Sequence, residues 1–455
     1  MPYRRSSLAR ITTLAFALPI ALFASVTQAD DRAVSQTFHP QGAALEHRQP
    51  VEWNRTMPHR ARPGDLDPTF GESGRVTVPS RGFALPTGDG KYWVVAKREN
   101  TPGRVEVRRL LDNGAPDPTF PLDGAVVDLY PGAQDFELFA MRRQSNGKVI
   151  LGGRLFLADG TTVPLFARLR TDGQLDTAFG RNGIALVDFD DEAPIRYLYG
   201  IDIQRDDKIV ASTLSDIGGK IFPRLVRLGA DGTQDPGFGR NGVVYDMPEG
   251  VIFLSTAALD DGNLLFGGMS EPNENAVVTR LRSDGTVDNA FGEAGFVHLD
   301  HRDHPGMRVG GAVQAHRDGS VVVGGTSLTP TLSGWAARLL PNGTLDRRFN
   351  NGSPLFAEYL SVYAMAKQDD GKIVLSGASR MPDQRYMAVG RLNQDGSFDT
   401  SFGQEGIALT PAPAQNAYSN AYSYVETQGS KLFVSDVVMT NDIYEVQLLR
   451  YDLTH

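Results

Sequence analysis

The sequence of 455 residues contains no cysteine. Disulfide bonds, thiolate-bound zinc, a cysteine nucleophile and a cysteine-linked lipid are therefore excluded. Basic residues are outnumbered, with 45 Lys and Arg against 54 Asp and Glu, and the formal net charge is −9. An acidic chain is a poor general binder of nucleic acid, because neutralising phosphates requires a surplus of Lys and Arg. We therefore expect no nucleic-acid partner.

Long apolar runs are absent after the first 29 residues, so no membrane span is expected there. Residues 1–29 contain Arg4, Arg5 and Arg10 in a basic first part, continue with the apolar run 11–26 and end in Thr27-Gln28-Ala29. This order is typical of a secretory signal peptide, used by either Sec or twin-arginine export. The alternative is a membrane anchor, for which the apolar run is short. We expect an exported bacterial protein, either periplasmic or extracellular at the cell surface.

Residues 30–63 are rich in Gln, His, Arg and Pro and show no apolar period, so they predict a flexible leader. Cleavage after residue 29 removes three Arg and no acidic residue, which changes the formal net charge from −9 to −12. The leader precedes residues 64–455, which we interpret as one folded domain.

A repeated phrase, Asp-x-x-Phe, usually followed by Gly, organises this domain. Its seven copies lie 50 to 59 residues apart and comprise Asp67 and Phe70, Asp117 and Phe120, Asp176 and Phe179, Asp235 and Phe238, Asp288 and Phe291, Asp346 and Phe349, and Asp399 and Phe402. Short apolar segments and Asp-Gly or Asn-Gly turns fill each interval, which indicates β-strands. Four antiparallel strands per unit predict an all-β, seven-bladed β-propeller. The alternative is an open solenoid, which needs capping repeats.

The two ends of the repeat array look split and not capped. The last strand set, ending with Glu445 to Leu453, has no outer strand after it, whereas the strand Gly74 to Val78 precedes the first complete set. We predict that this N-terminal strand completes the last blade and closes a monomeric ring. Closure removes exposed strand edges, which are sites of aggregation.

An Arg stands eight residues before the repeated Asp in six units, while Arg450 has no following Asp and Asp67 has no preceding Arg. This register predicts an Arg–Asp ion pair at each outer blade corner, with Arg450 and Asp67 meeting across the closure. A metal site at every repeated Asp is the alternative. The repeated Phe is interpreted as a plug between blades, each contributing about 1.5–3 kcal/mol by burial.

Three phrases carry a family resemblance: Arg-Leu-x-x-Asp-Gly, Asp-x-x-Phe-Gly-x-x-Gly and Gln-x-Asp-Gly-Lys-Ile-Val, of which residues 368–374 are a close instance. The sequence resembles the bacterial delta-60 repeat family over about residues 64–455. The resemblance implies an exported or surface β-propeller and brings no catalytic residues. Pro121 and Asn350 follow the repeated Phe where the family has Gly, so we expect those two turns to differ.

Function is expected where the repeats differ, on the face that carries the D–A and B–C loops, with strands A to D running from the inner to the outer edge of a blade. Acidic residues in or beside these loops predict a negative rim for a cation, a basic peptide or an amine, or else a solubilising surface. They are Asp128, Asp135, Glu137, Asp188, Asp190, Asp191, Glu192, Asp246 and Glu249. Tyr418 and Tyr422 are candidates for sugar or peptide contact, or for core packing.

A histidine-rich segment supplies the candidate metal ligands His298, Asp300, His301, Asp303 and His304. Imidazole and carboxylate suit a divalent first-row metal. The alternatives are a solvated polar loop and general acid–base chemistry.

Sequence motifs for a nucleophile elbow, a zinc protease, a P-loop or a dinucleotide site are absent. We therefore expect an exported, non-catalytic binding or surface-interaction module, whose partner is a protein, glycan or small ligand on the loop face. The alternatives are a periplasmic or extracellular hydrolase or lyase, with or without a metal, and a purely structural surface component.

Overall fold

The computed structural model describes residues 62–98, 101–121, 124–190, 195–271, 275–301, 303–304, 306–316, 318–327, 332–358, 360–380, 384–414, 417–419 and 424–454. The expected signal peptide lies outside these residues, as does the leader apart from its last two residues, so both stay predictions. No helix in the described part of the chain has the length and apolarity needed to cross a membrane.

Residues 60–455 form a unit of seven antiparallel sheets. Blade 1 contains β2 (Gly82–Pro86), β3 (Tyr92–Lys97), β4 (Arg104–Leu110) and β5 (Ala125–Asp128). Blade 2 contains β6 (Asp135–Arg143), β7 (Val149–Phe156), β8 (Thr162–Leu169) and β9 (Ile184–Leu186). Blade 3 contains β10 (Ile195–Ile203), β11 (Ile209–Ile217), β12 (Lys220–Leu228) and β13 (Val243–Val244).

Blades 4 to 6 repeat this order. Blade 4 contains β14 (Val251–Ala258), β15 (Leu264–Ser270), β16 (Asn275–Leu281) and β17 (Phe296–Leu299). Blade 5 contains β18 (Met307–Ala315), β19 (Val321–Ser327), β20 (Ser333–Leu339) and β21 (Leu355–Glu358). Blade 6 contains β22 (Leu360–Lys367), β23 (Ile373–Arg380), β24 (Arg385–Leu392) and β25 (Ile407–Pro411). A 3-10 turn, η1 (Asn350–Gly352), precedes β21.

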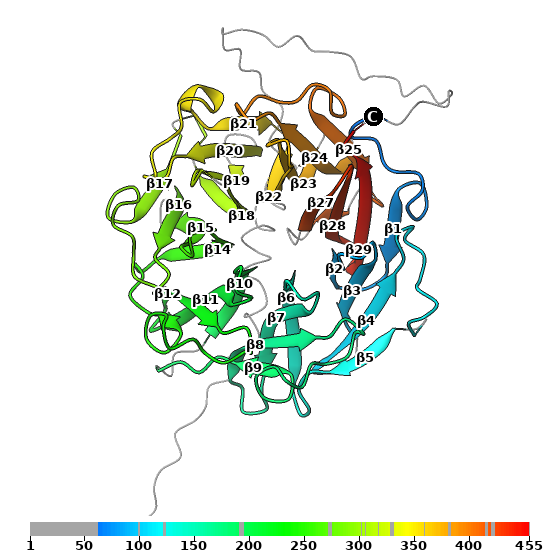
Figure 1. Ribbon diagram of the computed structural model, residues 1–455, viewed down its shortest axis with the longest axis vertical. Helices are drawn as coiled ribbons and strands as arrows, with labels where there is room; N and C mark the ends of the chain where they lie inside the picture. The colour runs from blue at the N-terminus through cyan, green and yellow to red at the C-terminus, as the bar shows by residue number, and fades with distance from the viewer. Residues whose placement is uncertain are drawn as a thin grey trace, which may run out of the picture. The chain divides into compact units, whose positions relative to one another are not determined.

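Blade 7 joins the two ends of this unit. It contains β26 (Tyr418–Ser419), β27 (Tyr424–Gln428), β28 (Lys431–Thr440), β29 (Ile443–Asp452) and β1 (Arg75–Val78). Strand β1 pairs antiparallel with β29, with Arg75 opposite Leu449 and Val78 opposite Val446. Figure 1 shows β1 beside β29 in a ring of seven blades whose inner strands face the centre. The predicted propeller and its closure by the N-terminal strand are both confirmed.

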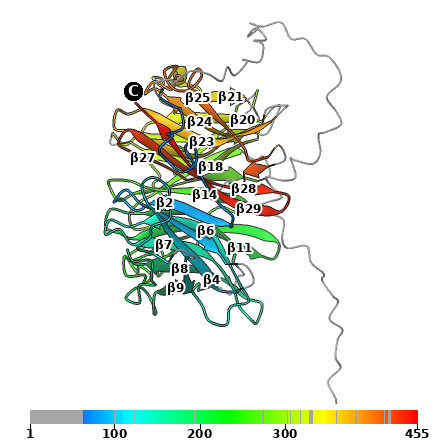
Figure 2. The same ribbon diagram turned by 90° about the vertical axis from the view of Figure 1, so that its right-hand side faces the viewer.

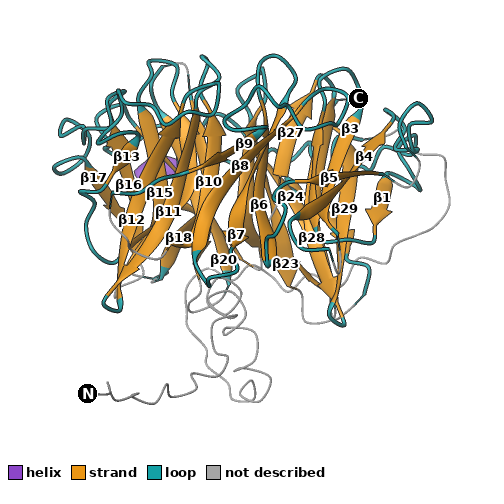
Figure 3. Cartoon of the chain, turned by 90° about the horizontal axis from the view of Figure 1, so that it is seen from below, coloured by secondary structure: helices purple, strands orange, loops and turns teal. Residues whose placement is uncertain are grey.

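The connections gather at two ends of the strands (Figures 2 and 3). We call the end with the A–B and C–D connections the turn face, and the end with the D–A and B–C connections the loop face. The long C–D connections, such as residues 111–124 of blade 1, make the turn face the more elaborate of the two.

The predicted Arg–Asp pair is present at all seven corners. In each blade the Arg Nε donates to Asp Oδ2 at 2.7 to 2.8 Å, and Asp Oδ1 accepts the backbone N–H two residues later. Across the closure, Arg450 and Asp67 lie 2.8 Å apart with side chains only 5% and 1% exposed. Burial opposes the charged form of Asp67, but hydrogen bonds from Lys431 and Thr69 and the charge of Arg450 outweigh it and hold the pKa of this carboxyl well below its usual range.

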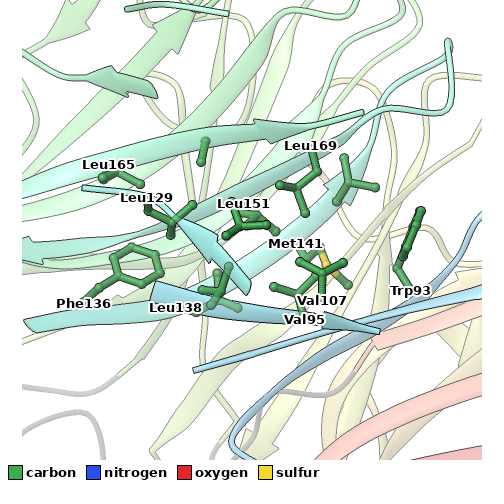
Figure 4. Close-up of a cluster of buried hydrophobic side chains, with 14 of the residues drawn as sticks. Trp93, Val95, Val107, Leu129, Phe136, Leu138, Met141, Leu151, Leu165 and Leu169 are labelled. Carbon is green, nitrogen blue, oxygen red and sulfur yellow. The ribbon is translucent and has the colours of Figure 1, made fainter. Parts of the chain in front are cut away.

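The repeated Phe plugs the seam between neighbouring blades, as predicted. Phe120 of blade 1 packs edge-on against Trp93, with ring centroids 5.4 Å apart. A Cβ on Gly173 of blade 2 would lie 2.8 Å from the Phe120 ring, so the seam requires glycine there. An apolar cluster continues along the inside of the same seam, from Trp93 through Leu138 to Phe136 (Figure 4).

Replacing Arg450 by Met tests the closing ion pair. This change leaves the buried Asp67 carboxylate with Lys431 as its remaining cation, so the loss of unfolding free energy should stay below the roughly 3–5 kcal/mol of an unpaired buried charge. The matched control is Arg170→Gln, which breaks an exposed pair with Asp172 and is expected to cost no more than about 0.5 kcal/mol. Urea unfolding measures both, and equal losses in the two variants would contradict the role given to Arg450.

Candidate functional site

Two hydrogen bonds recur where one blade meets the next on the turn face. In the first, the residue after the repeated Phe donates its backbone N–H to a carbonyl in the C–D turn of the next blade at 2.7 to 2.8 Å. The pairs are Gly71 and Asn113, Gly180 and Asp231, Gly239 and Asp284, Gly292 and Asn342, Asn350 and Asp395, and Gly403 and Pro63.

In the second, Nη1 of the corner Arg donates to a neighbouring carbonyl of that same turn, at 2.5 to 2.7 Å. The pairs are Arg168 and Ala230, Arg227 and Ser283, Arg280 and Pro341, Arg338 and Gln394, Arg391 and Leu453, and Arg450 and Asp112. Six of the seven seams therefore carry both bonds.

The seam between blades 1 and 2 carries neither bond among the described residues. Pro121 follows Phe120, and proline has no N–H to donate. Proline also cannot adopt the positive φ, between 43° and 61°, that the other six residues at this position share. Arg109 keeps Asp117 at 2.8 Å and Thr119 at 2.9 Å, but its Nη1 donates to no described residue. Its side chain is 17% exposed, the most of the seven corner arginines.

The A–B turn of blade 1 also departs from the repeat. In blades 2 and 3 this turn begins with Gln144 and Gln204, whose side-chain amides reach backbone carbonyls in the next blade at 2.9 and 3.5 Å. The equivalent residue of blade 1 is Thr87, which closes the same backbone turn but whose short side chain bonds Asp89 instead. Thr87 therefore makes no hydrogen bond to a described residue of blade 2 that would correspond to the glutamine amide bond.

A pocket of about 310 Å³ opens at this seam. Its walls contain hydroxyl, carboxylate, guanidinium and indole groups, and the lining residues are Thr87, Gly88, Asp89, Trp93, Arg109, Arg143, Ser145, Gly147 and Thr171. This size is at the lower end of small-molecule sites, and a mixture of donors and acceptors suits a polar ligand.

Arg143 links the pocket to the innermost strands. Its Nη2 donates to Glu426 of blade 7 at 3.1 Å, whereas its Nε is buried without a hydrogen-bond partner. Glu426 also accepts the Tyr424 hydroxyl, and burial and this carboxylate raise the pKa of Tyr424. The neighbouring Arg142 lies over the Tyr424 ring, with Cζ 5.6 Å from its centroid. These contacts hold the Arg143 guanidinium in place.

Asp89 supplies the carboxylate on the other wall of the pocket. The Thr87 hydroxyl bond lowers the pKa of Asp89 more than burial raises it, so the group stays ionised. The wall therefore offers a hydrogen-bond acceptor beside the two arginine donors.

Basic groups accompany many of the described acidic residues that were expected to form a negative rim on the loop face, whereas Asp188 and Asp190 contact the C–D connection of blade 3. Salt bridges join Asp128 to Arg104, Asp135 to Lys97, Glu137 to Arg154, Asp190 to Arg240, and Glu249 to Lys220, at 2.6 to 3.2 Å. Asp188 exchanges backbone bonds with the side chain of Gln234, and Asp246 is exposed. The loop face is therefore a mixed-charge surface at these positions, and ligand binding there stays a prediction.

Other expected site residues fall partly outside the described chain. Asp191, Glu192 and Tyr422 are not among the described residues. Tyr418 belongs to β26, where its backbone pairs with Met439, and its side chain is not described.

The histidine segment places two of its imidazoles against an aromatic ring. His304 stacks on Phe356 at 3.7 Å, and His301 lies 4.9 Å from the same ring. Burial and the neighbouring His301 lower the pKa of His304. His298 is exposed on β17, Asp300 and Asp303 are exposed in the loop that follows, and the described residues contain no group of three His, Cys, Asp or Glu placed to hold a metal ion. The metal site stays a prediction.

A second pocket, of about 360 Å³, lies on the loop face of blade 1. Its two charged residues, Arg104 and Asp128, already bond each other at 3.2 Å, and Pro102, Pro131 and Gly132 supply much of the remaining wall. It offers a ligand fewer unsatisfied groups than the pocket between blades 1 and 2. Sequence reasoning missed that pocket, although Pro121 and Thr87 were its visible signals.

His316 provides a pH test of the A–B turns, because it occupies the position of Gln144 and its Nε2 is buried without a partner. Burial and the charge of Lys367 lower the pKa of His316 to about 4. The folded chain therefore keeps this imidazole neutral, while the unfolded chain protonates it near its usual value of about 6.5. The contribution of the neutral His316 to the free energy of unfolding should be fully present above about pH 6.5 and should be lost as the pH falls toward 4.

Replacing His316 by Gln should remove this pH dependence, on the order of 1–3 kcal/mol between about pH 7.5 and pH 4.5. Urea unfolding at the two pH values measures it. The exposed His298→Gln serves as the control and should keep the wild-type difference. A His316→Gln protein with the wild-type pH dependence would refute the assignment.

Comparison with known proteins agrees with this architecture. The model of a domain of unknown function (DUF5122) beta-propeller matches residues 87–120, 144–179, 204–238 and 368–402. A comparison with curated proteins finds no match.

Among solved structures, the chain is similar to polysaccharide lyase Uly1, at 10% identity and TM-score 0.48, over 84% of this chain and 91% of that one. It is also similar to a Trypanosoma rangeli sialidase mutant displaying trans-sialidase activity, at 13% identity and TM-score 0.41, over 85% and 59%. A third is Drosophila semaphorin 1a, extracellular domains 1-2, at 10% identity and TM-score 0.43, over 83% and 86%. The four family matches each run from an A–B turn to a repeated Phe, and they support a β-propeller repeat family for this chain.

Proposed function

We propose that this protein is an exported, non-catalytic binding module that holds a small polar ligand in the pocket between blades 1 and 2. One observation carries the proposal. Six seams are joined by both turn-face bonds, whereas the described residues of the seam with Pro121 make neither bond and line a pocket. A closed ring supplies the rigid frame on which one altered seam can serve binding. The proposal moves the ligand from the expected loop face to the turn face.

Export and repeat type belong to the same proposal. The basic start, the apolar run and the small residues that end at Ala29 support a cleaved signal peptide. The repeated phrases support the delta-60 type, which is a family of exported repeat proteins.

Mass spectrometry of the protein from its bacterial source tests export. We expect a mature chain that begins at Asp30, because the small residues Thr27 and Ala29 stand where signal peptidase reads. The protein should then be found in the periplasmic or extracellular fraction. A chain that keeps residues 1–29 and sediments with membranes would support the anchor instead.

Ligand binding is tested by closing the pocket with Thr87→Gln. Glutamine restores the residue that bridges blades at position 144, and its amide should reach the backbone of Gly147 and fill the opening. A thermal-shift screen of sugars, sugar acids and amino acids should find a ligand for the wild type. Saturation at about 100 times the Kd adds about 2.7 kcal/mol of stability.

The matched control is Thr161→Gln, since Thr161 also bonds an Asp two residues away but lies in an exposed B–C turn. The ligand should stabilise the control and not the Thr87→Gln protein. Equal stabilisation of both variants would place the ligand elsewhere, and the absence of any ligand would overturn the binding module. Turnover of an oligosaccharide in the same screen would support a hydrolase or lyase.

A further inference from the structure

We propose that the ligand of the pocket between blades 1 and 2 is a polyhydroxy acid of monosaccharide size, whose carboxylate is bound by Arg109 and Arg143. This inference rests on the proposed function and specifies the ligand class. The ligand class follows from the hydrogen-bond donors and acceptors of the pocket that have no partner among the described protein residues.

Arg109 provides the first free donor. In the other six blades the equivalent Nη1 is used by a carbonyl of the next blade, but Arg109 Nη1 has no such partner among the described residues. The guanidinium is nevertheless held, because Nε bonds Asp117 and Cζ lies 5.5 Å from the centre of the Trp93 ring. A fixed guanidinium with a free N–H edge is a ready site for a carboxylate.

Arg143 provides the second donor. Its Nη2 is anchored by Glu426 at 3.1 Å, and its buried Nε has no hydrogen-bond partner. Gly88 makes room for it, since a Cβ at that position would lie 2.6 Å from Arg143 Nη1. Since Nε is buried, the donor within reach of a ligand is Nη1, which lies beside Gly88 in the pocket wall and makes no hydrogen bond to a described residue.

The remaining walls favour hydroxyl groups on the ligand. Asp89 is exposed and ionised, and can accept hydrogen bonds from ligand hydroxyls. Ser145 donates its own hydroxyl to Asp207 at 2.6 Å, which leaves its oxygen free to accept. The carboxylate of Asp117 is only 1% exposed, so it is turned away from the ligand. The pocket thus combines guanidinium donors for an acid with acceptors for hydroxyls.

Isothermal titration with glucuronate and glucose tests this inference, because the two sugars differ only at C6, which is a carboxylate in glucuronate and a hydroxymethyl group in glucose. Wild-type protein should bind glucuronate roughly tenfold or more tightly than glucose, as expected for charge-assisted hydrogen bonds. Arg143→Gln should reduce this preference several-fold, because only Arg109 then remains to bind the carboxylate. Arg205→Gln, which breaks an exposed pair with Asp260 and does not line the pocket, should keep it.

Each other outcome separates the two proposals. Equal binding of both sugars that is lost in Thr87→Gln would refute the acid class and keep the pocket. If neither sugar binds, but another ligand binds the wild type and not the Thr87→Gln protein, the acid class is likewise refuted and the pocket is kept. Glucuronate binding that Arg143→Gln and Thr87→Gln leave unchanged would overturn both proposals.

Discussion

The guanidinium of the corner arginine is the group on which the ring depends. Its Nε holds the Asp that shapes the C–D turn, its Cζ lies 4.6 to 5.3 Å from the centre of the Phe plug, and in six seams its Nη1 bonds the next blade. One side chain therefore joins a turn, a core and a seam. The Asp backbone N–H also bonds the carbonyl of the Arg eight residues earlier, as in Asp117 and Arg109, and this turn accounts for the fixed spacing.

The chain closes this ring without covalent help. It has no cysteine, so the two ends of the propeller are joined by the β1–β29 ladder and by Arg450. Arg450 makes the same contacts as the other corner arginines, although its Asp67 partner lies 383 residues away in sequence. The closing seam is thus equivalent to an internal seam, and no strand edge of blade 7 remains where β1 pairs.

The fold could be predicted from the sequence because every unit repeats the same Asp and Phe at its C–D turn. The absence of an Asp after Arg450 identified Asp67 as its partner in ring closure. The candidate site could not be predicted in the same way. Glu249 meets Lys220, and Asp190 meets Arg240, across connections that only the folded blades bring together, so the expected negative rim contains its own counter-ions. Pro121 was visible as a departure, but the bond that it removes joins two blades and has no sequence signature.

The pocket follows from a local loss of symmetry. Proline at 121 removes one hydrogen bond, worth about 1 kcal/mol, and the apolar cluster from Trp93 to Phe136 still holds blades 1 and 2 together. In the other six seams the equivalent Nη1 bonds a backbone carbonyl of the next blade, so this donor is not available to a ligand there. A ring of seven blades thereby acquires one seam that differs from the other six, and the proposed site predicts a stoichiometry of one ligand per ring. Specificity then arises where the repeat is least regular, on a frame that the regular units keep rigid.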